Sequence, residues 1–495
     1  MDEVIPLSDA TLSNLPQNVL VPCYDRSKLT AGIVHIGVGN FHRAHQAWYL
    51  HRLMQEGVCH DWAIIGAGVR PNDSIQRDKL MEQNCLATLI ELDPTGKSAE
   101  VVGSMIDYIQ VEENNHSLIE RLAKPDIRIV SLTITEGGYY IDPASGKFNE
   151  TNPDIIYDAM NADTPRTTFG AMIAALRIRR DNGFGPFTGL SCDNIQNNGN
   201  ILKHTILSLA GLSDPDLAQW IDENCSFPNT MVDCIVPVTG PKELQLTRNF
   251  GISDNVPVTH ENYRQWVIED DFCAGRPSWE KVGVTFSNQV HQFEAMKLRI
   301  LNGGHQIIAV AGALLGLETI SSAMKNKGIR SLLRKTVIEE IAPNVKPVQS
   351  MTSSEYLDLI DQRFSNSEII DTTRRVAYDG SSRQPGFVVP SIRDALTQDL
   401  PIDGLALTSA LWMRYCGAVK EDGSTIEAND PNWDELHANA HLALKDPVLW
   451  LEMLQVYGEL GDNTRFVDAF GRWVSHLKDH GVDSALSSFA DGFDG

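Results

Sequence analysis

The feature that most constrains this chain is an alternation, in its first half, of short apolar runs with stretches of helical periodicity. Residues 31–39 read AGIVHIGVG, and residues 41–57 then repeat apolar side chains at helical spacing. Further apolar runs and one more helical pattern follow at residues 61–69, 98–106, 126–135, 169–180 (helical) and 185–194. Strands that alternate with helices predict an α/β domain with a parallel, doubly wound sheet.

The second half of the chain shows the 3.6-residue period of amphipathic helices instead. This period is found in residues 294–316, 330–342, 354–364, 405–419 and 448–460. Loops are expected near residues 343–347, 379–390 and 422–431, where proline, glycine and polar residues gather. The second half should therefore form a mainly α-helical domain.

The composition argues against some binding partners and some cellular locations, and so restricts the class of protein that we expect. The 495 residues include 41 Lys and Arg against 65 Asp and Glu, a net charge of −24. Binding to nucleic acid or to an anionic membrane needs clustered cations, so neither partner is expected. The polar N-terminus does not resemble a secretory signal, and no apolar run is long enough to span a membrane. Eight single cysteines without a C-x-x-C pair are typical of reduced thiols, so we expect a cytoplasmic protein.

The turn between the first strand and the first helix predicts a dinucleotide site. In Gly37-Val38-Gly39 the first glycine permits a tight turn and the second lets a pyrophosphate approach the backbone. The third glycine of the usual fingerprint is replaced by His42, so a turn without a ligand stays open as an alternative. His42 and His45 are interpreted as packing groups or groups at the rim of a cleft, because no third metal ligand is in view.

These patterns together predict two domains. Residues 1–285 should form a dinucleotide-binding domain of Rossmann type, and residues 286–495 a mainly helical domain for substrate binding and catalysis. The active site is expected in the cleft between them.

The end of the second strand bears on the choice of cofactor. Asp73 follows it closely and could accept hydrogen bonds from the adenosine ribose, which favours NAD. Arg70 lies beside it and could instead receive a 2′-phosphate, so NADP stays possible.

The segment EAMKLRILNGGHQ contains the strongest candidate for a catalytic base. In one regular helix, Glu294, Lys297, Asn302 and His305 would share one half of the surface, among apolar residues. A lysine in such surroundings can be lowered in pKa and take a proton from an alcohol, while an asparagine amide donates to the oxygen. The alternative is a surface helix with a Glu294–Lys297 ion pair. The glycine pair at 303–304 should let a backbone or ligand come close.

Several separated segments resemble the polyol-specific long-chain dehydrogenase/reductase family. They are IVHIGVGNFHRAHQ (33–46), RIVSLTITEGGYY (128–140), SCDNIQNNG (191–199), FPNTMVD (227–233), QWVIED (265–270), GRPSWEKVGV (275–284), KLRILNGGH (297–305) and DGSSRQPGF (379–387). The resemblance covers most of the chain in consistent order. It implies NAD-dependent oxidation of a secondary alcohol of an acyclic polyol, of the mannitol-to-fructose type, by a monomeric enzyme that uses a lysine and no metal.

The resemblance also implies roles for individual residues. Lys297 is similar to the family's general base, Asn194 and Asn302 to the amides that bind the reacting oxygen, and His305 to a residue that orients the base or a substrate hydroxyl. Glu136 resembles a glutamate that passes the proton toward water. The remaining positions are those for substrate hydroxyls, Asp233, Arg375 and Arg383, and those for the cofactor, Gly37, Gly39, Phe41 and Asp73.

Three positions depart from the family pattern. Cys234 replaces the arginine that follows the aspartate of the V-D-R-I motif, and Arg383 replaces a lysine. Arg383 keeps the charge but offers a planar fork in place of a compact ammonium group. Asn72 stands where a glutamate often precedes the ribose aspartate, which leaves room for some use of NADP.

Two other functions remain open at this point. A hexuronate reductase of the same fold, acting on fructuronate or tagaturonate, could use Arg375 and Arg383 to hold a carboxylate. A nucleotide-binding sensor without catalysis could keep the fold, although it would have no need of a base such as Lys297.

Overall fold

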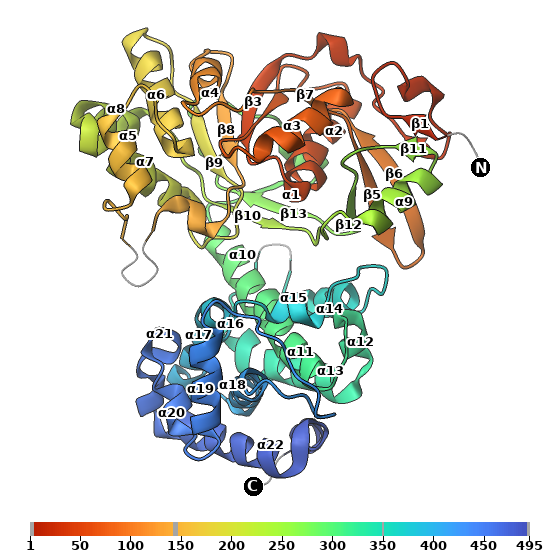
Figure 1. Cartoon of the computed structure of the whole chain (residues 1–495), viewed down its shortest axis with the longest axis vertical. Helices are drawn as coiled ribbons and strands as arrows, with labels where there is room; N and C mark the ends of the chain where they lie inside the picture. The colour runs from red at the N-terminus through yellow and green to blue at the C-terminus, as the bar shows by residue number, and fades with distance from the viewer. Residues whose placement is uncertain (1–3, 142–146, 349–350, 493–495) are drawn as a thin grey trace. The chain divides into compact units, whose positions relative to one another are not determined.

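The computed structural model describes residues 4–141, 147–348 and 351–492 (Figure 1). The chain divides into two compact units, Met1–His291 and Gln292–Gly495. The first unit combines sheets and helices, whereas the second is built from helices. Both agree with the predicted fold class, a doubly wound sheet of Rossmann type followed by a mainly helical domain.

The centre of the first unit is a five-stranded parallel sheet. Its strands stand in the order β7 (Met105–Tyr108), β4 (Ala63–Ala67), β3 (Ala31–Ile36), β8 (Ile129–Leu132) and β9 (Thr188–Ser191). The strand order reverses between β3 and β8, which is where dinucleotides bind in folds of this kind. The predicted apolar runs supply all five of these strands.

Helices cover both faces of this sheet, which explains why its strands are apolar throughout. Val34 and Val130 belong to one hydrophobic core, while their neighbours Ile33 and Ile129 belong to the other. Successive residues of a strand point to opposite faces, so both faces are buried. The helices are α2 (Gln46–Gln55) and α3 (Asp73–Glu82), and α4 (His116–Leu122), α5 (Pro153–Met160), α6 (Thr168–Asp181), α7 (Asn198–Ser213) and α8 (Pro215–Asn224) (Figure 1).

The predicted helix over residues 41–57 is interrupted. The structure has α1 (Asn40–Ala44) and α2, which are separated by a non-helical residue, His45, with φ −120° and ψ −92°. The His45 ring lies 2.9 Å from the carbonyl oxygen of Gln265 and packs against Phe41 and Trp266. This packing turns the chain at His45, which helical periodicity could not indicate.

Smaller sheets complete the first unit. One has the strand order β12 (Val258–Glu261), β5 (Ala87–Asp93), β6 (Gly96–Val102) and β2 (Val19–Leu20). Another has the order β10 (Thr230–Asp233), β13 (Gln265–Ile268) and β14 (Thr285–Phe286). A third pairs β1 (Ile5–Pro6) with β11 (Ile252–Ser253), which contacts α9 (Pro241–Asn249). The apolar run at residues 98–106 is not one strand, because its two ends enter β6 and β7 of different sheets.

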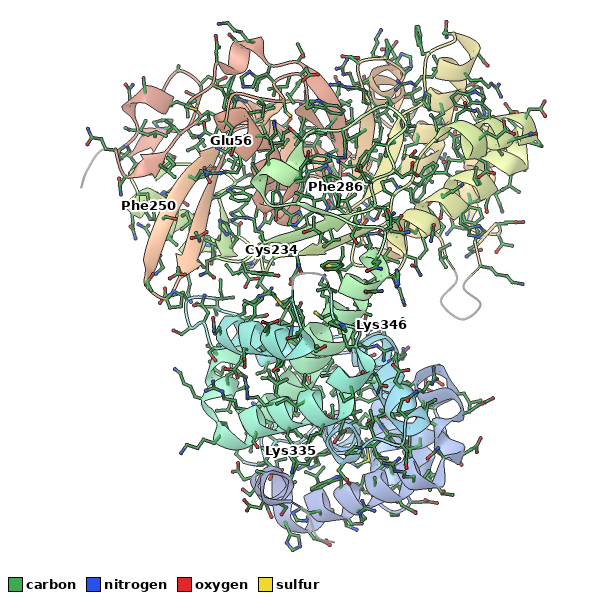
Figure 2. The ribbon with its side chains drawn as sticks, turned by 180° about the vertical axis from the view of Figure 1, so that it is seen from behind. Glu56, Cys234, Phe250, Phe286, Lys335 and Lys346 are labelled. Atoms are coloured by element: carbon green, nitrogen blue, oxygen red, sulfur yellow. The ribbon has the colours of Figure 1, made fainter. Side chains whose placement is uncertain are left out.

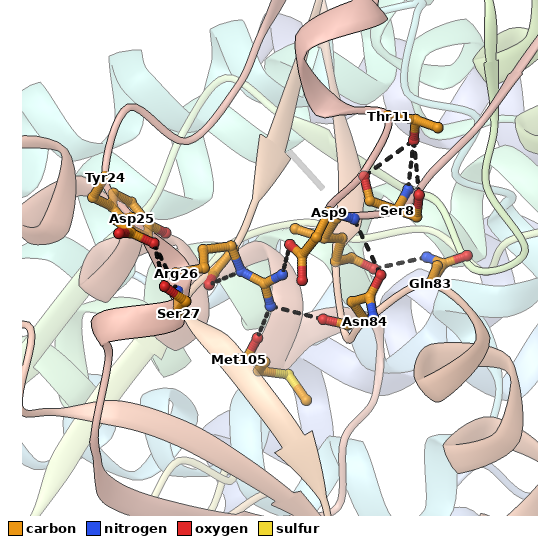
Figure 3. A network of polar contacts seen from close by, with 12 residues as sticks. Ser8, Asp9, Thr11, Tyr24, Asp25, Arg26, Ser27, Gln83, Asn84 and Met105 are labelled. Carbon is orange, nitrogen blue, oxygen red and sulfur yellow. Dashed lines mark hydrogen bonds and ion pairs between the residues drawn. The ribbon is translucent and has the colours of Figure 1, made fainter.

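Arg26 ties the N-terminal segment to the junction of these two sheets (Figure 3). Its Nε donates to the carbonyl of Gly103 at 2.9 Å, its Nη2 donates to Asn84 and Met105 at 2.7 and 2.6 Å, and its Nη1 binds Asp9. A pocket of about 430 Å³ lies here. Because the donors of Arg26 already have protein acceptors, we interpret the network as structural.

The second unit packs helices around α11 (Gly303–Leu314) and α18 (Asp403–Cys416). The other α-helices are α10 (Val290–Met296, which begins before the boundary), α12 (Ile320–Lys325), α13 (Lys327–Thr336), α14 (Ser353–Phe364), α15 (Thr373–Ala377), α16 (Gly380–Arg383), α17 (Val389–Thr397), α19 (Trp433–Ala443), α20 (Val448–Leu451), α21 (Leu454–Tyr457) and α22 (Thr464–Asp491). Lys335 of α13 donates to the carbonyl of Phe489 in α22 at 3.2 Å (Figure 2).

Two expectations for this unit are wrong. Residues 379–390 are not a loop: α16 leads into the π-helix η8 (Gln384–Val388) and then into α17, with prolines in the first turn of the last two, where a missing N–H costs no bond. The lysine segment is also not one regular helix. Between α10 and α11 it forms the π-helix η5 (Lys297–Asn302), and a third π-helix is η6 (Val337–Ile341).

Helix α7 offers a matched pair of substitutions that tests this packing. At Gly199 an added Cβ would lie 2.4 Å from the backbone oxygens of Phe227 and Pro228, whereas at Gly211 it would meet nothing within 4 Å. Gly199→Ala should therefore destabilise the first unit by about 1–3 kcal/mol. Gly211→Ala should stabilise it by about 0.5–1 kcal/mol, because alanine favours the helix. Unfolding midpoints measured calorimetrically should move in opposite directions, and a downward shift in both would contradict this account.

Candidate functional site

The glycine turn is built for a close approach at both of its glycines. Gly37 has φ +93°, and a Cβ there would lie 2.1 Å from the carbonyl oxygen of Thr133, at the end of β8. At Gly39, which precedes α1, an added Cβ would meet no atom within 4 Å. The first glycine is thus required by the contact between strand ends, and the second leaves open space where a phosphate could reach the backbone. Phe41 follows in α1 and stacks on His45, with ring centroids 4.7 Å apart.

Two buried imidazoles, those of His35 and His42, pack next to this turn. The rings of His35 and His42 stack with centroids 3.4 Å apart, and neither side chain is more than 1% exposed. Nε2 of His35 lies 3.2 Å from the Gly37 carbonyl, to which the Thr133 hydroxyl donates at 2.6 Å. Burial lowers the pKa of His35 to about 3 and that of His42 well below its usual value, so both rings are neutral. The structure thus places His42 and His45 in the packed interior.

Asp73 stands at the first position of α3, just after β4. Its carboxylate accepts hydrogen bonds from the backbone N–H groups of Val69 and Arg70 at 3.0 and 2.9 Å. An added Cβ at Gly68 would lie 2.4 Å from the Asp73 side chain, so the carboxylate is held against the end of the strand. Arg70 is exposed beside it.

Asn194 and Glu136 follow the carboxyl ends of two neighbouring strands. Asn194 comes three residues after β9, and Glu136 begins the short helix η3 (Glu136–Tyr139) after β8. The Glu136 side chain lies outside the described part of the structure. Because β3, β8 and β9 are adjacent, Gly37, Glu136 and Asn194 belong to one edge of the sheet.

Asp233 ends strand β10, which is tied to the Asn194 segment by one buried amide. The Asn198 side chain donates to the carbonyls of Asp193 and Thr230 at 3.1 and 3.0 Å, and accepts from the Thr230 N–H at 2.9 Å. Asp233 is 5% exposed, and the atypical Cys234 follows it directly (Figure 2). The first unit therefore joins the segments that carry Asn194 and Asp233.

In the second unit, Lys297 and Asn302 begin and end the π-helix η5. Lys297 is only 6% exposed, and Oδ1 of the half-buried Asn302 has no hydrogen-bond partner among the residues described. A π-helix bonds residue i to i+5, so the regular α-helix on which the predicted grouping rests does not apply to this segment. π-Helical turns occur frequently at functional sites, which agrees with a special role for this lysine.

His305 follows in α11, and the glycine pair before it allows close packing, as expected. The His305 ring stacks on Phe364 with centroids 4.1 Å apart. A Cβ at Gly303 would lie 3.3 Å from the Phe387 carbonyl of η8, and one at Gly304 would lie 2.9 Å from the Leu333 side chain. The DGSSRQPGF segment thus packs directly on the lysine segment.

Arg383 donates to the carbonyl group next to Arg375 in the sequence, whereas the Arg375 side chain itself binds Asp371. Arg383 donates to the carbonyl of Val376 at 2.7 Å, and Gln306, next to His305, donates to it at 3.1 Å. Arg375 is the neighbour of Val376 and forms a bidentate pair with Asp371, with both contacts at 2.6 Å. Sequence reasoning missed Asp371, although its i,i+4 spacing from Arg375 was available as a signal.

The described residues contain no group of three or more His, Cys, Asp or Glu side chains arranged to hold a metal ion. Within the same residues, no helix combines the length and apolar character that a membrane span requires.

Comparison with known proteins gives matches to both units. Residues 31–281 match the mannitol dehydrogenase Rossmann domain, and residues 289–478 match the mannitol dehydrogenase C-terminal domain. Mannitol 2-dehydrogenase of Cereibacter sphaeroides is 51% identical over 475 residues, which cover 96% of this chain and 99% of that protein.

Two solved structures are also similar over nearly the whole chain. The ternary complex of Pseudomonas fluorescens mannitol 2-dehydrogenase with NAD and D-mannitol has a TM-score of 0.88 and 38% identity, and covers 99% of this chain and 100% of its own. A substrate-free D-sorbitol dehydrogenase has a TM-score of 0.89 and 33% identity, covering 97% and 100%.

The buried histidines predict that acid destabilises the first unit. An unfolded histidine binds a proton near pH 6.5, whereas folded His35 does so only near pH 3, so the unfolded chain binds more protons between these values. The free energy of unfolding should therefore decrease as the pH is lowered, by about 2 kcal/mol for His35 from pH 7 to pH 5. Calorimetry should show a weaker pH dependence in His42→Phe, which keeps a ring but cannot be protonated. His116→Gln, at an exposed histidine, is the control, and equal slopes in all three proteins would contradict the prediction.

Proposed function

The chain belongs to the mannitol dehydrogenase family, and on this basis we propose that it oxidises a secondary alcohol of an acyclic polyol to a ketose with NAD, and reduces the ketose in reverse. The observation that carries the proposal is the likeness of the whole chain to an enzyme solved with NAD and D-mannitol. The glycine turn supports it, because Gly39 leaves room for a pyrophosphate. Mannitol and fructose are the substrate pair that we expect first.

We assign the proton transfer to Lys297. Lys297 is only 6% exposed, so its side chain is shielded from bulk water, and an amine of this kind can accept the proton of an alcohol. Lys297 takes the hydroxyl proton, while the amides of Asn194 and Asn302 donate to the oxygen as negative charge grows on it. The glycine turn and Asp73 would hold NAD, which would supply the hydride acceptor for the carbinol carbon. No metal is assigned a part, since the lysine and amides supply the base and the charge stabilisation.

The remaining candidates are given supporting roles. His305 orients the base or a hydroxyl, and its ring is fixed by stacking on Phe364. Glu136 passes the proton on toward water. Asp233, Arg375 and Arg383 hold the other hydroxyls of the substrate.

One observation favours a polyol over a hexuronate. The guanidinium of Arg375 already forms a bidentate pair with Asp371, which neutralises its charge and occupies two of its donors. A substrate carboxylate would have to compete with Asp371 for this arginine. The neutral hydroxyls of a polyol need only the donors that remain.

The position of Asp73 supports NAD as the preferred cofactor. Its carboxylate is fixed at the end of β4 by two backbone N–H groups. A negative charge held there accepts hydrogen bonds from ribose hydroxyls and repels a 2′-phosphate. Arg70 and Asn72 leave room for weaker use of NADP.

We further propose that the enzyme works in the cytoplasm as a monomer, without nucleic acid or a membrane as partner. The single cysteines of the sequence suit a reducing compartment, and Cys23 among them is an exposed free thiol. Sedimentation at the mass of one chain, 54.8 kDa, is the result expected.

Replacement of Lys297 tests the mechanism. Lys297→Ala should lower kcat by about 10²–10⁴-fold, the usual contribution of a general base, and leave NAD binding near normal. Small primary amines added to the assay should restore part of the rate, because they can take the proton in place of the lysine. Lys346→Ala removes an exposed lysine of the same unit and should retain activity (Figure 2). Near-normal turnover of Lys297→Ala would refute the assignment.

A steady-state screen tests the activity itself. Mannitol, glucitol and arabinitol are offered with NAD and with NADP, and fructose, fructuronate and tagaturonate with the reduced cofactors. We expect the highest kcat/KM for mannitol with NAD and for fructose with NADH. Faster reduction of fructuronate or tagaturonate would support the hexuronate reductase, and the absence of turnover on every ketose would support a sensor.

A further inference from the structure

Asp193, the residue before Asn194, accepts hydrogen bonds from three donors at the end of β8. Its Oδ1 accepts from the N–H of Thr135 at 2.9 Å, and its Oδ2 accepts from the N–H of Ile134 at 3.1 Å and from the Tyr139 hydroxyl at 2.7 Å. Burial, and then the charge of Asp193, raise the pKa of Tyr139, so this hydroxyl stays protonated and donates. Asp193 is 8% exposed, so the bonds are largely shielded from water.

The backbone that this carboxylate holds is strained. Thr135 has φ +68° and ψ 163°, a region that a β-branched residue rarely adopts. Such a conformation persists only where neighbouring groups impose it. The backbone N–H of Thr135 donates to the Asp193 carboxylate, and Glu136 is the next residue of the chain.

The main chain of Asp193 is fixed as firmly as its side chain. Its carbonyl accepts from the N–H of Ile195 at 2.9 Å, which closes a three-residue turn with Asn194 at its centre. The same carbonyl accepts from the buried Asn198 amide at 3.1 Å. Asn194 therefore lies in a turn whose first residue, Asp193, is bound to the end of β8 through its carboxylate and to α7 through its carbonyl.

We propose that Asp193 is a positioning residue, which clamps the end of β8 to the end of β9 and so sets the place of the Asn194 amide for the reacting oxygen. This inference rests on the proposed function, because the amide matters only if Asn194 binds that oxygen. Asp193 does not itself need to touch substrate. Its contribution is to hold Thr135 in a strained conformation and Asn194 in its turn.

A second aspartate of the same unit provides a matched control. Asp158 of α5 is 3% exposed and also accepts from two backbone N–H groups and one hydroxyl, those of Arg166 at 2.7 Å and of Thr167 at 3.0 and 2.6 Å. It clamps a loop before α6 and carries none of the candidate residues. Asp158→Asn should thus have the structural cost of losing a buried clamp without the effect on catalysis.

The first test compares Asp193→Asn with Asp158→Asn. We expect both to lower the unfolding midpoint, but only Asp193→Asn to lower kcat for polyol oxidation, by about 10–100-fold, because small displacements of a catalytic group cost this much. The KM for NAD should stay within about twofold, since the glycine turn is not altered. If both variants lose kcat equally, or neither does, the inference is wrong. A wild-type protein without polyol activity would instead overturn the proposed function.

The second test uses the strain. Thr135→Gly lets the backbone adopt φ +68° without steric cost, so this conformation depends less on the hydrogen bonds to Asp193. In the Thr135→Gly background, Asp193→Asn should cost less than a third of the kcat factor that it costs in the wild type. An equal loss in both backgrounds would show that Asp193 does not act through Thr135. If Asp193→Asn does not fold, Tyr139→Phe takes its place, because it removes one of the three donors to Asp193. A smaller loss of kcat is then expected, and an unchanged kcat would contradict the proposed role of Asp193.

Discussion

The close approach of Gly37 to the carbonyl of Thr133 is the constraint on which the arrangement of the first unit depends. A hydrogen atom is all that fits between the ends of β3 and β8 at this point. The contact brings together the two strands at which the order of the sheet reverses, and the Thr133 hydroxyl adds a bond of 2.6 Å across it. The glycine turn, the start of η3 and, through Asp193, the Asn194 turn are all placed by the same pair of strand ends. The stacked neutral rings of His35 and His42 fill the space next to the turn. A smaller side chain would leave a cavity there.

The fold class could be read from the sequence because its signals are local and repeated. Strands buried on both faces appear as continuous apolar runs, and Ile33, Val34, Ile129 and Val130 show why: adjacent residues enter different cores. The interruption at His45 could not be read in this way, since its cause is a contact with Gln265, more than two hundred residues away in the sequence. Residues 379–390 were misjudged for the opposite reason, because their glycines and prolines indicate a loop although the prolines stand in first turns of helical segments.

The candidate site was only partly accessible to the same reasoning. Spacing identified Lys297, Asn302 and His305 as a group, but it assumed a regular helix where the chain forms a π-helix. The roles of Asn194, Glu136 and Asp233 came from the resemblance to a family, not from any periodicity. Asp193 is not found by sequence reasoning, because its hydrogen bonds to Ile134, Thr135 and Tyr139 join segments that meet only in the folded chain. Asp371 differs, since its i,i+4 spacing from Arg375 is visible in the sequence. Family membership and fold are established by the comparisons, whereas the individual roles remain predictions.

The three π-helices found among the described residues of the second unit affect how this protein can vary. Each widened turn leaves a helix locally underpacked unless a neighbour fills the space, and η5 lies beside both η6 and η8. The Phe387 carbonyl, which faces Gly303, is one such filling contact. A single-residue deletion that returned η5 to α-helical form would rotate the residues on one side of it and disturb its contacts with η6 and η8. Lineages that diverge from this chain should therefore gain or lose these irregular turns together, and side chains along the three segments should covary more strongly than their separation in sequence suggests.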